Sequence, residues 1–189
     1  MLCLFVAGTA MTTTSCSSDN GGIAQILGTL LTNLLGQQGT VYNFTGNGTM
    51  QVLKNTAAAG TDPVWTKVTE SLTFQGTLPL TVNNTAATLQ IPALNLGGNQ
   101  MSQVTFSQLV LTAHSSGQTV DYTKIDTGTS STATGTLTVN GTAYNVSNLY
   151  IDAKATNETM TVKGMSIYFG DNFEYVVNVV FTGTAAAQQ

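Results

Sequence analysis

An alternation of apolar and polar residues, sustained from Thr40 almost to the C-terminus, is the strongest constraint on the fold of this chain. A period of two is typical of β-strands that bury one face and expose the other. The segment Phe173–Phe181 shows this period most clearly, because every second residue in it is large and apolar. Similar segments recur between short turns, and together they predict about eight to ten antiparallel strands in a barrel or a closed sandwich.

Two turns organise these strands. Asn140-Gly141 lies between two alternating segments and favours the type I′ turn of a two-residue β-hairpin. Upstream, Thr81–Ala86 reads TVNNTA, one letter from the TVNGTA of Thr138–Ala143, and we expect an equivalent turn at Asn83-Asn84. We interpret this near-repeat as a sign of two related halves that complete one sheet system.

The composition narrows the class of protein. Charged residues make up only 7% of the 189 residues, there is no arginine, and threonine alone occurs 34 times. Threonine is β-branched and suits the half-exposed face of a strand, which it solvates through hydroxyls rather than charge. The net charge of −4 argues against nucleic-acid binding, because phosphate neutralisation needs a basic patch. We therefore expect an all-β extracytoplasmic protein with no nucleic-acid partner.

The N-terminal segment resembles an export signal. An apolar run, LCLFVA, is followed by small and hydroxylated residues up to Cys16, and it fits the hydrophobic region of a signal peptide. Thr13-Thr14-Ser15-Cys16 resembles a bacterial lipobox, in which the cysteine receives the lipid. We expect a signal peptide over residues 1–15 and a lipid anchor on Cys16. The alternative is an ordinary signal peptide in which Cys16 has no role.

A single helix is predicted between the anchor and the strands. Ile23–Leu35 carries apolar residues at the i, i+3, i+4, i+7 spacing of an amphipathic helix. This face has no Lys or Arg, so we expect it to pack on its own protein rather than on a membrane surface. The predicted organisation is a tether with this helix over residues 16–39, a β domain over residues 40–184 and a frayed tail over residues 185–189.

Several of these features occur together in a known family. The Thr-Ser-Cys leader, the Leu-rich tether, TLTVNGTAYNV, the segment Leu89–Leu111 and the C-terminal FEYVVNVVFTG together resemble the calycin-like β-barrel lipoproteins of Bacteroidetes. The resemblance implies a lipocalin-like antiparallel barrel and an address in the cell envelope, at the outer membrane. Members are mostly of unassigned function, so no catalytic residue is carried over.

The sequence offers little for catalysis or metal binding. His114 is the only histidine, and we expect it in an exposed loop beside two serines. Both cysteines lie in the leader, so the β domain has too few soft ligands for a zinc site. The carboxylates are scattered and are interpreted as solubility charges. We therefore predict no enzyme, no cofactor and no bound metal.

Three residues are candidates for ligand binding. Trp65 and Tyr150 are aromatic side chains that could stack on a sugar, and Glu70 shares the parity of core-facing Val68 and Leu72. An inward carboxylate would need a partner or a raised pKa. The leading hypothesis is a non-enzymatic envelope lipoprotein whose β domain is a binding or interaction module. The alternatives are a lipocalin-like carrier of a small apolar ligand and a surface glycan-binding module.

Overall fold

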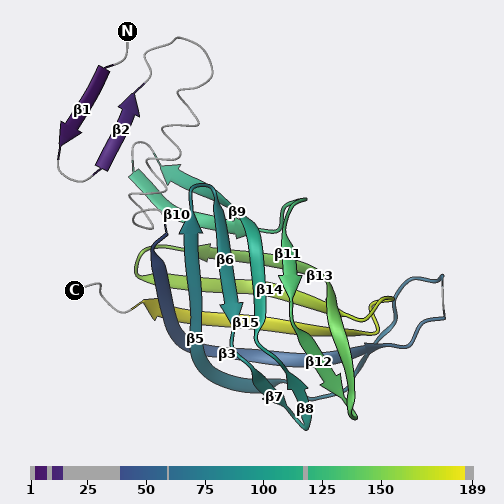
Figure 1. Cartoon of the computed structure of the whole chain (residues 1–189). Helices are drawn as coiled ribbons and strands as arrows, with labels where there is room; N and C mark the ends of the chain where they lie inside the picture. The colour runs from purple at the N-terminus through teal and green to yellow at the C-terminus, as the bar shows by residue number, and fades with distance from the viewer. Residues whose placement is uncertain (1–2, 8–9, 15–38, 59, 117–118, 186–189) are drawn as a thin grey trace.

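Eight antiparallel strands close into a barrel in the computed structural model, which describes residues 3–7, 10–14, 39–58, 60–116 and 119–185 (Figure 1). Each barrel strand pairs with the next one along the chain, and the last pairs with the first. This closed arrangement confirms the predicted all-β fold and selects the barrel over the sandwich. The barrel strands are β3 (Val41–Asn55), β5 (Leu72–Asn83), β6 (Ala86–Ile91), β9 (Val104–Ser116), β10 (Thr119–Asp126), β13 (Thr142–Ala155), β14 (Thr159–Phe169) and β15 (Tyr175–Ala185).

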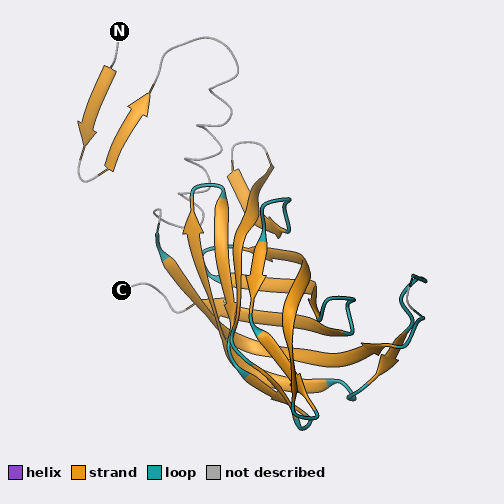
Figure 2. Cartoon of the chain, turned by 45° about the vertical axis from the view of Figure 1, so that its right-hand side comes forward, coloured by secondary structure: helices purple, strands orange, loops and turns teal. Residues whose placement is uncertain are grey.

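Short strands extend the barrel at three places. On β13, the strands β12 (Thr136–Val139), β8 (Asn99–Met101) and β7 (Leu94–Leu96) continue the sheet in that order. β4 (Trp65–Lys67) pairs with β3, and β11 (Thr132–Thr134) pairs with β9. Figure 2 shows that the described residues are strands and loops.

The N-terminal residues that the structure describes form a sheet of their own. β1 (Cys3–Ala7) and β2 (Ala10–Thr14) pair as an antiparallel hairpin that does not join the barrel sheet. Cys16 and the predicted helix Ile23–Leu35 lie outside the described residues, so both remain predictions from the sequence.

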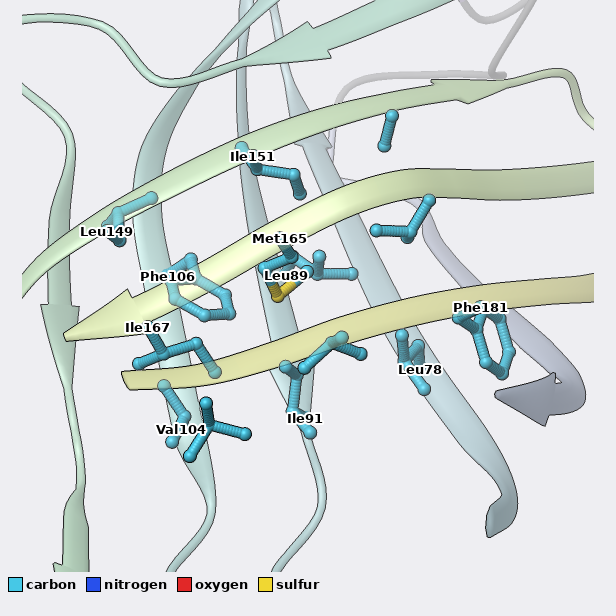
Figure 3. Close-up of a cluster of buried hydrophobic side chains, with 14 of the residues drawn as sticks. Leu78, Leu89, Ile91, Val104, Phe106, Leu149, Ile151, Met165, Ile167 and Phe181 are labelled. Atoms are coloured by element: carbon cyan, nitrogen blue, oxygen red, sulfur yellow. The ribbon is translucent and has the colours of Figure 1, made fainter. Parts of the chain in front are cut away.

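The barrel interior is filled by apolar side chains. Residues from β13, β14 and β15 meet residues from β5, β6 and β9 across the interior (Figure 3). Phe44, Phe106, Phe169 and Phe181 are the largest of these side chains, and none is more than 1% exposed. Lining atoms of a ligand-sized void would be accessible to solvent, so these values indicate close packing.

A row of glycines allows the sheet to turn sharply where the barrel closes. Gly76, Gly46 and Gly183 lie opposite one another on β5, β3 and β15. A Cβ at Gly46 would overlap the carbonyl oxygen of Thr182, so β3 and β15 approach too closely here for any side chain. Glycine at such a position is a known device for introducing curvature into a sheet.

Two phenylalanines cover the next row. Phe74 and Phe181 lie opposite Gly48 from either side, and their ring centroids are 6.0 Å apart in a stacked arrangement. A Cβ on Gly48 would overlap the Phe74 ring. The aromatic rings therefore occupy the space that the missing side chain leaves, which restores apolar packing at the corner.

The two near-repeats fold into different turns. Asn140 and Gly141 both have positive φ, at 50° and 82°, in the predicted two-residue hairpin turn between β12 and β13. In the upstream copy Asn83 pairs with Ala86, so the turn is Asn84-Thr85 and not Asn83-Asn84. The two copies are out of step by one residue, and β5 and β6 belong to one continuous meander. The expectation of an equivalent turn at Asn83-Asn84 is therefore wrong.

Gly46→Ala should destabilise the barrel by about 3 kcal/mol, because the new Cβ must displace the β15 backbone. Gly164→Ala is the matched control, since a Cβ at this strand glycine would meet nothing within 4 Å. Denaturant unfolding followed by circular dichroism measures both. Equal stability of the two variants would contradict the role of Gly46 in closure.

One hydroxyl inside the barrel lacks a partner among the described residues. Thr123 on β10 is 0% exposed, its Oγ1 makes no hydrogen bond, and its neighbours in register are Ala113 and Ala155. Thr123→Val should stabilise the protein by about 1 kcal/mol, because the buried hydroxyl is replaced by a methyl group of similar shape. Thr123→Ser keeps the hydroxyl and should destabilise by a similar amount. A destabilised Thr123→Val variant, measured by denaturant unfolding, would show that the hydroxyl has a partner.

Candidate functional site on the outer face

Three aromatic side chains from distant parts of the sequence gather on the outside of the barrel. The ring of Trp65, on β4, is 6.1 Å from that of Tyr168, on β14, and Tyr168 is 5.4 Å from Phe173 in an edge-to-face arrangement. Trp65 and Tyr168 are half-buried, and Phe173 is 37% exposed. We call Trp65, Tyr168 and Phe173 the aromatic surface.

The strand register explains how these rings meet. Tyr168, Val176 and Leu53 lie in one row across β14, β15 and β3, and their side chains alternate away from the barrel interior. Val176 is only 3% exposed although it is not part of the interior core cluster. It is therefore buried on the outer face, at the centre of the row that the aromatic surface adjoins. Trp65 reaches this row from β4, which is paired to the far side of β3.

A hydrogen-bonded hairpin holds Trp65 in place. Trp65 lies opposite Asn55, at the point where β3 and β4 separate into the loop that connects them. The Asn55 side-chain oxygen accepts hydrogen bonds from the backbone N–H groups of Ala57 and Val64, at 3.0 and 3.2 Å. The Thr56 N–H donates to the Val64 carbonyl at 2.8 Å. The loop is thereby fixed from within, and the tryptophan lies on a defined support.

Phe173 has an unusual backbone conformation. Its φ is +54°, a left-handed value that is uncommon for a bulky residue and costs free energy. It lies in the turn between β14 and β15, where its N–H donates to the Gly170 carbonyl and the Glu174 carboxylate accepts the Asn172 N–H at 3.2 Å. The turn therefore enforces the conformation that brings the Phe173 ring against Tyr168. Strain of this kind is often found at functional sites.

The structure places two of the three candidate residues, Trp65 and Tyr150, on the outer face of the barrel. Trp65 is not the isolated aromatic that the sequence indicated, because Tyr168 lies beside it. Tyr150, on β13, is 55% exposed and lies opposite Ser166, one position along β14 from Tyr168 on the outer face. Tyr150 is thus on the strand beside that of Tyr168, and it is close enough to Lys124 on β10 to interact with it electrostatically. Tyr168 and Phe173 were not singled out from the sequence, where only their place in alternating segments was visible.

The interpretation of Glu70 as an inward carboxylate is wrong. Its side chain is 84% exposed and forms an ion pair with Lys67 at 3.5 Å. The parity argument assumes that Val68, Glu70 and Leu72 belong to one strand, but β4 ends at Lys67 and β5 begins at Leu72. The intervening bend breaks the alternation, so the parity of Glu70 says nothing about the barrel interior.

His114 is exposed as predicted, but it lies on β9 and not in a loop. Its ring stacks on Tyr122 with the centroids 4.8 Å apart, and the Lys154 ammonium lies 5.5 Å from the Tyr122 ring. The nearby Ser116 hydroxyl donates to Asp121 at 3.0 Å and not to His114. This arrangement is a surface stack of rings rather than a nucleophile activated by a base.

The charges on the described surface are few and local. The Asp126 carboxylate accepts a hydrogen bond from Lys124 at 3.0 Å, which raises the pKa of the Lys124 ammonium. Within the described part of the chain, no three His, Cys, Asp or Glu side chains lie close enough together to hold a metal ion. The described residues also contain no helix with the length and apolar character that crossing a membrane requires.

Comparison of this chain with protein-family models, with curated proteins and with solved structures finds no match. The function of the chain is therefore inferred from its own residues and their geometry.

Proposed function

We propose that this protein is a non-enzymatic lipoprotein of the cell envelope that binds carbohydrate through the aromatic surface. The observation that supports the proposal is the cluster of Trp65, Tyr168 and Phe173, which presents partly exposed rings on a support fixed by hydrogen bonds. Aromatic side chains with an apolar face and a polar edge suit binding at a wet surface. The C–H faces of sugar rings pack on such aromatic faces.

Polar groups beside the rings fit the same ligand. The row next to Tyr168 and Val176 consists of Ser166, Asn178 and Gln51, which lie opposite one another on β14, β15 and β3. The Ser166 hydroxyl donates to the Asn178 side-chain oxygen at 2.8 Å. Hydroxyl and amide groups can both donate and accept hydrogen bonds, as sugar hydroxyls do. Apolar rings beside uncharged polar groups therefore match the two sides of a saccharide.

The alternative of a lipocalin-like carrier receives less support. A carrier needs an interior cavity for its apolar ligand. Most of the described core side chains are almost completely inaccessible, such as Leu78 and Leu89 at 0%, and only a few that pack against them, such as Leu72 and Phe74, are partly exposed. A ligand in the barrel would have to displace the packed core, whereas the aromatic surface is accessible without any rearrangement.

The first test is binding to a glycan array by the full chain, followed by titration of the hit. Trp65 is the only tryptophan, so its fluorescence reports directly on the proposed surface and should change on binding. Trp65→Ala should weaken binding at least about tenfold, as expected for a central aromatic contact. Tyr122→Ala is the matched control, because Tyr122 is also a half-buried outer aromatic with one ring neighbour. An array without hits would overturn the proposal.

The envelope address depends on Cys16. Mass spectrometry of the mature N-terminus should find a diacylated cysteine at position 16, and globomycin should block its processing. Cys16→Ser should release the protein from the membrane fraction, because two acyl chains are what holds such a protein at a bilayer. An unmodified N-terminus at another residue would contradict the lipid anchor and leave the carbohydrate-binding proposal to be judged separately.

A further inference from the structure

We propose a second binding site on the same outer face, a hollow over β3, β5 and β15 that takes uncharged sugar units. This inference rests on the proposed carbohydrate binding and extends it, because it makes the ligand an extended neutral oligosaccharide that contacts both sites. The hollow has a volume of about 470 Å³. We call it the outer hollow, and it is lined by Asn47, Gly48, Thr49, Thr73, Phe74, Gln75, Val180, Phe181 and Thr182.

The side chains of the outer hollow come from three adjacent strands in register. Thr73, Thr49 and Val180 form one row across β5, β3 and β15, and Gln75, Asn47 and Thr182 form the next. All six are exposed and alternate with residues that face the interior. The site is therefore a regular block of the outer sheet, with neighbouring strands about 4.8 Å apart.

The chemistry of the lining selects the class of ligand. Most of the accessible lining is apolar, two amides and three hydroxyls add donors and acceptors, and none of the lining residues carries a charge. Such groups can pair with a polyhydroxylated ring without any counter-charge. An acidic sugar would lose part of its hydration at this site and gain no cation in return. The lining therefore favours neutral saccharides.

The base of the hollow is rigid. Phe74 and Phe181, which are part of the lining, stack on each other beside Gly48 at the closure of the barrel. The outward side chains on either side of this row therefore project from a rigid part of the sheet. A site that needs little ordering on binding retains more of its interaction free energy.

The outer hollow and the aromatic surface are joined along β15. Val176, Asn178, Val180 and Thr182 are successive outward residues on this strand. From Val176 to Thr182 the strand extends roughly 20 Å at about 3.3 Å per residue, which exceeds the length of a disaccharide. A ligand that contacts both sites must therefore be longer, with its middle over Asn178 and the neighbouring Gln51.

The test measures affinity against chain length for the full chain, by titration calorimetry with the cellulose, amylose and chitin oligosaccharide series from disaccharide to hexasaccharide. For one of these neutral series, affinity should rise at least about tenfold with length. The double variant Asn47→Ala/Gln75→Ala should lose this gain and keep the affinity for the disaccharide. Gln100→Ala, an exposed glutamine on β8 outside the hollow, should behave as the unaltered protein. Thermal unfolding of each variant confirms that it is folded.

The outcomes separate the two proposals. If the double variant retains the gain with length, or if affinity does not depend on length, the outer hollow is not a second site although the protein still binds carbohydrate. Oligogalacturonides that bind as tightly as the neutral series would also overturn the inference. If no saccharide in the three series or on the array binds, both proposals fail.

Discussion

The close approach of β3 and β15 at Gly46 and Gly183 is the constraint on which the rest of the structure depends. An open sheet of eight strands would leave two unpaired edges, each a template for association with other chains. Closure removes both edges, but it requires the first and last barrel strands to meet at a sharp turn. The glycine row permits the turn, and Phe74 and Phe181 fill the space beside it. The residues that close the barrel therefore also shape the outer surface at this corner.

The packed interior also explains why both proposed sites lie on the outer face of the barrel. A filled interior leaves the outer face as the accessible part of the barrel, and most of this face is threonine, asparagine and glutamine. On β14, β15, β3 and β5, for example, Thr159, Thr184, Thr45 and Thr77 form one continuous row. Against this background the aromatic surface stands out, because Val176 is buried there without being part of the core.

Much of the fold could be predicted because its determinants are local. The alternation in Phe173–Phe181 and the Asn140-Gly141 turn depend on neighbours in the sequence. The meeting of Trp65 with Tyr168 could not be predicted, since it depends on a register across three intervening strand pairings. The wrong prediction for Glu70 has a related cause. Alternate residues share a face only within an unbroken strand, and the bend before Leu72 interrupts the strand. The six-letter near-repeat gave a wrong turn position in the upstream copy. The two copies differ only in Gly141 and Asn84, and the upstream turn lies one residue later than the downstream one.

The order of the strands has a consequence for how the chain reaches this structure. Apart from the closing ladder, every barrel pairing joins strands that follow one another in the meander, so the sheet can grow by adding hairpins at low entropic cost. The closing pair alone joins the two ends of the domain. Folding is therefore expected to end in one slow, non-local step, before which a nearly complete sheet exposes both of its edges. If the chain is exported as proposed, that step must wait until β15 has crossed the membrane.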